Sequence, residues 1–572
     1  MLQRILLALV VLGIPSLSRA QEGGARALPP GSQIYLRWDG FEAHRAAFDK
    51  SAIGKMMAGD TGKFLKGLVA YIEKQVDGLG GQGVPPQVVE IIKDLPKVLG
   101  VVGSNGFRVG VEVHKVSPPE IEGVLVFPKA GTDDAGLLPL IKKIAGQSGA
   151  EIKEEKVAGR DVFHIPSEHV HVGWWKEGDD AVIVIGTEGP QKAAKRVGGK
   201  GKHIAGNPMY KELQGFKEFP TWADGYLDIA KLFKVAEGFG EEIGKLIEDL
   251  GLKGLKSVTF HSGFDGPAER SVILVDIPGP RKGLLKIVNP KTIKLADLPP
   301  MPSDLTSFSA SNLDLAALYE AILGGVEAGV KIYLPNQADQ VKEGIKIVEN
   351  ILGVKLKEEL FGSFGDLVVS YSSPSEGPLG LGAVYLVKVK DAKKLQGSLD
   401  NLFKALGALP FVPVEVKKNT YRDAELHEIH VGGPAAAGFA YLPTFTIHKG
   451  WLALAFYPQP VQGYVLRSKG DLPAWKAGPN LTKRLENFPK EFVSIAVSDP
   501  RPTLKFLFSI APTGVALLNS LAAQFAPGAQ FDVSLLPNAL EVTRHLFPNI
   551  TVTTDDGKKL RIETRASLML PF

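Results

Sequence analysis

Histidine and carboxylate side chains gather in one short stretch of the sequence. His164, Glu168, His169 and His171 lie within eight residues. On a strand, His169 and His171 would point to the same side, because side chains alternate with a period of two. Two imidazoles with a carboxylate could bind zinc or copper through nitrogen and oxygen. The pattern therefore raises the hypothesis of a metal site at His164, His169 and His171.

Two features weigh against that metal site. Pro166-Ser167 predicts a turn between His164 and the other two histidines. The corresponding stretch later in the chain contains His427, Glu428 and His430, and it does not preserve the spacing. We therefore favour the ordinary interpretation, in which these are histidines at the edge of a strand, and keep the metal site as the alternative.

Familiar catalytic motifs are absent from the sequence. The chain has no cysteine, which removes thiol nucleophiles and thiolate metal sites. His427–His430 is one residue short of His-Glu-x-x-His, and Gly146–Gly149 lacks the pattern of a nucleophile elbow. Gly199–Lys202 lacks the Ser or Thr of a phosphate-binding loop. We expect no cofactor and assign no catalytic residue.

The N-terminus predicts export. Arg4 is followed by the apolar run Ile5–Ile14 and then by small residues at Ser18 and Ala20. This is the pattern of a signal peptide cleaved after Ala20. The run is much shorter than the roughly 20 residues of a membrane helix, and we expect no integral membrane segment after cleavage. Since a cysteine-free chain of this size suits bacterial export, we expect the periplasm or cell surface of a bacterium.

The charge balance argues against nucleic acid as a partner. Without Arg4 and Arg19, the chain has 64 basic and 62 acidic residues, and the two signs are mixed along it. A nearly neutral surface of this kind gives no electrostatic reason to bind nucleic acid or anionic membranes.

An internal repeat organises the chain. Residues 171–233 and 443–508 share the same order of features: two strands, a short helix, a Gly/Asn/Pro turn, a second helix, a Phe-Pro break, a strand and a helix. Leu28-Pro29-Pro30 in turn matches Leu298-Pro299-Pro300. We therefore predict a signal peptide at 1–20 and two homologous halves at 21–290 and 291–572, each divisible into two shorter sub-repeats.

Each half is predicted to be α+β, with antiparallel sheets packed against amphipathic helices. Four hairpins are expected, at Phe107–Phe127, Val258–Ile277, Leu367–Val389 and Ile550–Leu568. Leu315, Leu318, Tyr319, Ile322 and Leu323 have the spacing of a buried helical stripe, as do Val341, Ile345, Val348 and Leu352. Four residues are expected to cap helices: Asp39, Asp228, Asn312 and Asp499.

The strand–Asp–helix openings, the closing hairpins and the tandem halves behind a signal peptide resemble a class of exported bacterial proteins, the domain of unknown function numbered 3352. The resemblance lies around Leu28–Phe48 and Pro443–Phe508 and extends loosely over the mature chain. It implies an exported location and this style of fold, and it transfers no site residue.

Two functions follow as expectations. We favour a non-catalytic exported protein that acts as a binding or structural module for an unknown protein or small ligand. The alternative is an extracytoplasmic hydrolase or metal-dependent enzyme, with its site between the halves and drawing on His164, His169 and His171.

Overall fold

The structure is a computed structural model. It describes residues 25–79, 86–147, 149–199, 202–288, 291–334, 337–377, 380–408, 414–431, 441–525 and 531–568. The expected signal peptide at 1–20 lies outside the described residues.

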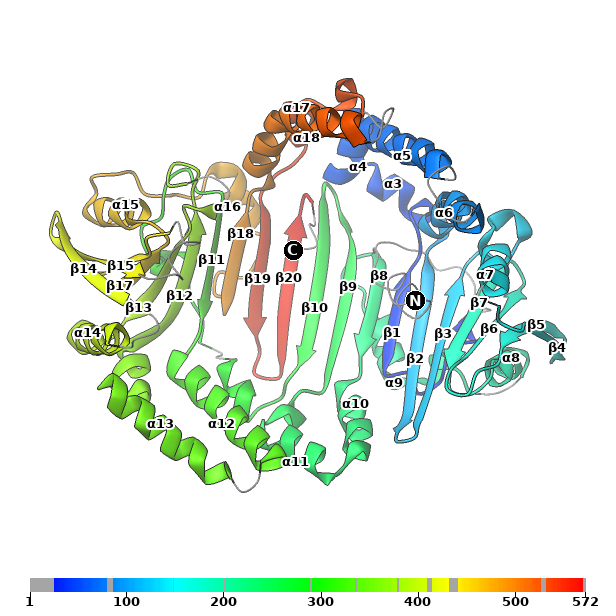
Figure 1. Cartoon of the computed structure of the whole chain (residues 1–572), viewed down its shortest axis with the longest axis horizontal. Coiled ribbons are helices and arrows are strands. Elements are labelled where there is room, and N and C mark those ends of the chain that lie inside the picture. Colours follow the sequence, from blue (N-terminus) through cyan, green and yellow to red (C-terminus); the bar gives the residue numbers. More distant parts are fainter. Residues whose placement is uncertain are drawn as a thin grey trace.

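One continuous antiparallel sheet of 20 strands forms the body of the molecule (Figure 1). From one end to its middle, the strands are β4 (Lys153–Val157), β5 (Arg160–Ile165), β6 (His171–Glu177), β7 (Asp180–Gly186), β3 (Pro119–Phe127), β2 (Phe107–Val116), β1 (Ile34–Trp38), β8 (Thr221–Leu227), β9 (Ser257–Asp265) and β10 (Ala268–Asp276).

The second set of strands begins beside β10. From the middle to the far end, it comprises β20 (Lys559–Ala566), β19 (Asn549–Asp555), β18 (Ser494–Ser498), β11 (Ser307–Asn312), β12 (Phe364–Ser372), β13 (Val384–Val389), β17 (Trp451–Ala455), β16 (Thr444–His448), β15 (Ala424–Val431) and β14 (Val414–Tyr421). Numbered from its own first strand, each set of ten has the same order of neighbours.

The two faces of the sheet differ in what covers them. On one face, here called the covered face, lie α8 (Gln191–Gly198), α9 (Pro208–Gly215), α15 (Pro458–Lys469) and α16 (Pro479–Leu485). Tyr35 and Val124 pack there with Ala193 of α8, and Phe308 and Val369 pack with Tyr464 of α15. These two clusters are the main cores of the protein. Alternate residues point to the opposite face, here called the open face.

Helices line the open face along both sides (Figure 1). One rim consists of α3 (Arg45–Phe48), α4 (Ala52–Ala58), α5 (Asp60–Leu79), α6 (Pro86–Asn105), α17 (Pro500–Phe525) and α18 (Ala539–Thr543). The other consists of α10 (Ile229–Ala236), α11 (Glu241–Asp249), α12 (Leu315–Tyr333) and α13 (Ala338–Leu352). Each rim contains helices from both sets of strands, and α18 contacts α5 just as α11 contacts α12.

Two more helices lie over the ends of the open face. They are α7 (Leu137–Gln147) and α14 (Ala392–Gly407). Lys142 of α7 lies 5.0 Å from the ring centroid of Phe163 on β5, and Phe403 of α14 stacks on Phe445 of β16. The open face is thus bounded on four sides by helices.

The α+β class and all four expected hairpins are confirmed: they are β2–β3, β9–β10, β12–β13 and β19–β20. The two predicted helical stripes do lie on helices, α12 and α13, but they are not buried. Ile322 is 53% exposed and Val348 is 46% exposed. The spacing therefore predicted the helices correctly and their burial wrongly, because these helices stand on a rim with no sheet over their apolar side.

Two of the four expected helix caps are confirmed. Asp228 accepts a hydrogen bond from the backbone N–H of Lys231, and Asp499 accepts one from that of Arg501. Asp39 instead lies buried, with Oδ2 3.6 Å from Arg37. Asn312 donates its side-chain N–H to the carbonyl of Lys291, and Asp314 caps α12 in its place.

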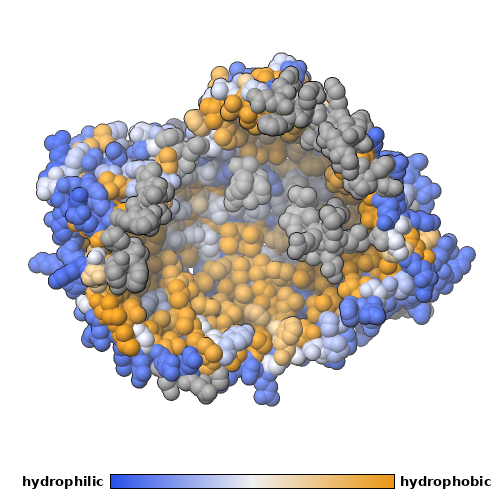
Figure 2. All heavy atoms as spheres, in the orientation of Figure 1, coloured by the Kyte–Doolittle hydropathy of each residue, from blue (hydrophilic) through white to orange (hydrophobic). Residues whose placement is uncertain are grey.

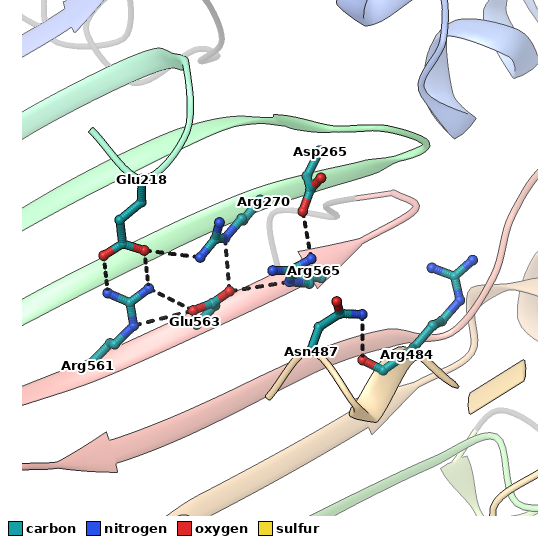
Figure 3. Close-up of polar contacts among 8 residues, drawn as sticks. All are labelled: Glu218, Asp265, Arg270, Arg484, Asn487, Arg561, Glu563 and Arg565. Atoms are coloured by element: carbon teal, nitrogen blue, oxygen red, sulfur yellow. Dashed lines mark hydrogen bonds and ion pairs between the residues drawn. The ribbon is translucent and has the colours of Figure 1, made fainter. Parts of the chain in front are cut away.

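The two sets of strands join through the ladder between β10 and β20, which pairs Glu269 with Ala566 at one end and Asp276 with Lys559 at the other. On the covered face of this ladder, arginines from both strands surround Glu563 (Figure 3). Its carboxylate accepts hydrogen bonds from Arg270, Arg561 and Arg565, at 2.9, 2.7 and 3.3 Å. The ladder and this ion network make the junction a solid seam.

The carboxylates at the seam compensate several positive charges. Glu218 accepts two hydrogen bonds from Arg561, each 2.7 Å long, and Asp265 accepts one of 2.6 Å from Arg565. Burial alone would raise the pKa of Glu563, but the hydrogen bonds and charges of Arg561 and Arg270 outweigh burial and lower it. Glu563 is therefore ionised in the folded protein and holds together arginines that would otherwise repel one another.

We expect Glu563→Gln to destabilise the protein by about 3 kcal/mol, because removing one partner of a buried ion network leaves the remaining charges uncompensated. Urea denaturation at pH 7 measures this. Glu541→Gln is the matched control, since Glu541 pairs with Arg544 on the surface of α18, and an exposed pair contributes less than about 1 kcal/mol. Equal effects of the two substitutions would contradict the role of the seam.

Candidate binding surface

The open face changes its chemistry from one end of the sheet to the other. A single row of directly paired residues crosses it from β2 to β12: Val109, Leu36, Gly225, Phe260, Ile273, Ile562, Thr553, Ser494, Ser311 and Val368. The row is apolar up to Ile562 of β20. It then carries hydroxyl groups from Thr553 of β19 to Ser311 of β11.

The apolar part of the open face, here called the apolar block, spans β2, β1, β8, β9, β10 and β20. Its members are half-exposed or exposed: Ile34, Leu36, Val109, Val111, Leu227, Val258, Phe260, Ile273, Val275, Leu560 and Ile562. An antiparallel sheet with one face in water ordinarily places polar residues on that face. The apolar block is therefore an exposed surface with the composition of a core.

The neighbouring strands β19, β18, β11 and β12 form the hydroxyl block. Paired rows of the open face there contain Ser372, Ser307, Ser498 and Asn549, then Ser370, Ser309, Ala496 and Thr551, then Val368, Ser311, Ser494 and Thr553. All twelve positions are uncharged. The hydroxyls of Ser309 and Ser370 lie 2.8 Å apart, as a cross-strand hydrogen bond.

The rims add apolar side chains beside the sheet. Large exposed hydrophobic residues on the rim helices include Leu65, Val69, Leu99, Ile322, Val326, Tyr333, Ile347, Val348, Ile351, Phe506, Leu507, Ile510, Leu517, Leu518, Leu521 and Leu540. Figure 2 shows the result from the open side: a hollow with apolar residues over its central and lower floor, paler residues toward β11 and β18, and hydrophilic residues around the outside. We call this hollow the trough.

One rim helix has a further property. In α17, residues Pro500–Leu521 are long and apolar enough to cross a membrane by length and composition, and none of the most apolar stretch is buried. We expected from the sequence that no stretch after the signal peptide approaches a membrane-spanning length, and by length and composition this helix does. In this structure α17 contacts α18, and Phe64 of α5 packs edge-on against its Phe508.

Two smaller hollows adjoin the trough. One, of about 800 Å³, lies beneath α7 and is lined by Phe163, Trp174, Arg160 and Glu177 among others. In it, Arg160 and Glu177 already pair with each other. The other, of about 390 Å³, is mostly apolar and lies between α5 and α17. The first hollow is lined by charged as well as apolar side chains, and only the second adds to the apolar surface of the rim.

The histidines of the predicted metal site do not converge. His164 lies on β5 with Nε2 3.9 Å from Glu155, His171 begins β6, and His169 lies exposed in the turn between them. The described residues contain no group of three or more His, Asp or Glu side chains that could hold a metal ion. In the second set of strands, His427 stacks flat on Phe445.

The sequence analysis missed the open face altogether. Its signal was present in β1, where Ile34, Leu36 and Trp38 alternate with Tyr35 and Arg37, so that both sides of the strand read as buried. In β11 the matching positions are serines. Comparing these two strands side by side would have shown that the positions of one face change from large apolar side chains to serines.

One ionisable group lies at the edge of the apolar block. Glu269 of β10 accepts a hydrogen bond of 3.2 Å from Ser262, whose hydroxyl oxygen in turn accepts one of 2.8 Å from Trp222. Burial raises the pKa of Glu269 from its ordinary value of 4.5 to about 7, and the hydrogen bond from Ser262 offsets only part of that. Glu269 therefore titrates near neutral pH.

Comparisons with known proteins leave the chain without a family. No family model matches it, and no curated protein matches it. Among solved structures, crystal forms I, III and IV of TP0453 match at TM-scores of 0.22, 0.23 and 0.22, with 12%, 10% and 10% identity. The matches cover 46%, 46% and 44% of this chain and 82%, 83% and 80% of those chains.

We expect Glu269→Gln to stabilise the protein at pH 8 and to leave its stability at pH 5 nearly unchanged. A carboxyl whose folded-state pKa is raised contributes stability at low pH that is lost as the pH rises from about 4.5 through 7. The amide does not titrate, so the difference between the two proteins grows over that window. The pKa of His261, lowered to about 4 by burial, affects both proteins alike.

Urea midpoints of the two proteins at pH 5 and pH 8 measure this difference. Glu120→Gln, at the exposed end of β3, is the matched strand control. If the urea midpoints of Glu269→Gln and the unchanged protein differ by the same amount at both pH values, the raised pKa of Glu269 is contradicted.

Proposed function

We propose that this protein is an exported, non-catalytic binding protein whose trough holds the hydrocarbon chains of a lipid. The observation that supports it is the apolar block, a half-exposed surface of Val, Ile, Leu and Phe side chains on an antiparallel sheet. Each Å² of apolar surface removed from water contributes about 25 cal/mol. A ligand that covers the block is therefore stabilised without any charged contact.

The dimensions of the block suit hydrocarbon chains. Six strands spaced about 4.8 Å apart give a floor about 24 Å wide, and the five residues of β1 extend about 16 Å along it. The hydrocarbon core of one bilayer leaflet is about 15 Å thick, half of the roughly 30 Å core. Extended chains laid across the strands, with their headgroup ends toward β19, would thus fit within the width of the floor, and the roughly 16 Å along the strands leaves room for several chains side by side.

The rims favour a small ligand over a second copy of this chain. Rim helices stand along both sides of the sheet, and α7 and α14 lie over its ends (Figure 1). Two floors could not meet face to face without these helices colliding, whereas chains of a lipid fit between them.

The exported location rests on the stretch from Arg4 to Ala20, and we place the protein in the periplasm or at the surface of a bacterial cell, where membrane lipids are close at hand. We further infer that the two sets of ten strands arose by duplication. Their identical order of neighbours supports this, as do two buried arginines, Arg196 at the end of α8 and Arg467 at the end of α15, which pair with Glu122 and Glu376. Duplication requires the two sets to superimpose strand by strand.

We expect the double substitution Leu227→Gln/Ile273→Gln to weaken binding of an apolar dye at least tenfold, since two apolar side chains of the floor each contribute about 1 kcal/mol when covered. Titration of 1-anilinonaphthalene-8-sulfonate fluorescence measures this. Organic extraction of the protein purified from its own cells, followed by mass spectrometry, should show copurified lipid that is depleted in the variant.

The control is Leu472→Gln. Leu472 and Leu227 are each 39% exposed, but Leu472 follows α15 on the covered side. Equal loss of dye binding in the control and the floor variant would contradict the proposal. Sedimentation as a dimer that the floor substitutions convert to a monomer would also contradict it, because a second copy would then cover the floor.

A further inference from the structure

We propose that the lipid held in the trough is an amphiphile with a neutral, hydroxyl-rich headgroup, such as a glycosylated lipid. Its chains lie over the apolar block and its headgroup lies over the hydroxyl block. This inference rests on the proposed function and adds the class of headgroup and the direction in which the ligand lies.

The apolar block and the hydroxyl block meet at the ladder between β20 and β19. Ile562 of β20 and Thr553 of β19 are direct partners across one ladder, and Phe260 and Ile273 continue the apolar side of the same row. In this row the floor therefore changes from hydrocarbon to hydroxyl within one strand spacing, about 4.8 Å. In the neighbouring row the hydroxyls continue onto Thr564 of β20. An amphiphile has the same change at the bond between its chains and its headgroup.

The side chains of the hydroxyl block are polar but carry no charge. Each Ser or Thr hydroxyl is both a donor and an acceptor, so it can pair with a ligand hydroxyl in either sense. Phosphate groups are ordinarily bound by arginine or lysine, and none of the twelve positions of the hydroxyl block is charged. Ser309 and Ser498 are exposed within the trough. The block thus offers neutral hydrogen bonding over several strands.

Matching strands of the two sets differ in the side chains of their open face. β1, β2, β8 and β9 occupy the places in the first set that β11, β12, β18 and β19 occupy in the second. On the covered face Tyr35 and Phe308 occupy matching places in the two cores, although the first set also buries the ion pair of Arg37 and Asp224 there. On the open face, Ser307 and Ser309 of β11 occupy the places that Ile34 and Leu36 occupy in β1. The open face therefore changes from hydrocarbon to hydroxyl between matching strands of the two sets, and this is the face on which a ligand would lie.

The experiment compares two neutral amphiphiles with the same chain. Decyl maltoside has a hydroxyl-rich headgroup, and decylphosphocholine has a zwitterionic phosphate headgroup. Each is titrated, below its micelle concentration, for its ability to displace 1-anilinonaphthalene-8-sulfonate from the purified protein. We expect the maltoside to bind about tenfold more tightly, which corresponds to two or three hydrogen bonds.

The variant is Ser309→Ala/Ser311→Ala/Ser494→Ala, which removes three hydroxyls from exposed or half-exposed positions of the floor. We expect it to lose the preference for the maltoside while binding decylphosphocholine as before. Ser468→Ala is the matched control, because that hydroxyl donates to the carbonyl of Tyr464 within α15 on the covered side. A second variant, Thr553→Leu, extends the apolar block by one strand beside Ile562 and should tighten binding of the dye.

The outcomes separate the two proposals. Equal affinity for the two amphiphiles in the unchanged protein, or an equal loss of both in the serine variant, would overturn the headgroup assignment and leave the apolar block in place. Binding of both amphiphiles that is insensitive to Leu227→Gln/Ile273→Gln would overturn the proposed function itself. Displacement of the dye by free maltose would show a sugar site without a chain, and would also overturn the inference.

Discussion

The ladder between β10 and β20 is the interaction on which the rest of the structure depends. Because it joins two sets of strands edge to edge, the sheet has no free edge in its middle, and both rims can pass from one set to the other. Hydrogen bonds from Arg270 and Arg561 to the carboxylate of Glu563 stabilise that ladder on the covered face. The seam thus turns two ten-stranded sheets into one floor long enough to carry two different chemistries.

Successive side chains of a strand point to opposite faces of the sheet. The residues that stabilise the fold and the residues that would bind a ligand therefore lie on different faces. The covered face contains the cores that fold the chain, so its residues are constrained by packing. Between the rims, the middle of the open face is not packed against a described layer of protein and can vary without disturbing those cores. That the apolar residues of the open face persist over six strands is therefore better explained by a ligand than by folding, since exposed apolar surface ordinarily disfavours a soluble state.

The sequence predicted the local elements well. Hairpins at Asp265-Gly266 and Asp556-Gly557, the helices at Leu315 and Val341, and the caps Asp228 and Asp499 all followed from residue type and spacing. It failed where tertiary context decides. Asp39 and Asn312 are residue types that commonly cap helices, but here they contact Arg108 and Lys291, which are distant in the chain. The apolar spacing of a stripe that contains Ile322 is the same whether or not a sheet covers it.

The trough itself could not be predicted from any single segment, because it depends on register between strands far apart in sequence. Ile562 and Thr553 are nine residues apart, yet the row they share reaches Val109 on one side and Ser311 on the other. A shift of one residue in any ladder would turn every side chain of that strand to the other face. The junction of apolar and hydroxyl surface therefore exists only because every register from β2 to β12 is maintained at once, and this argues that the junction is used.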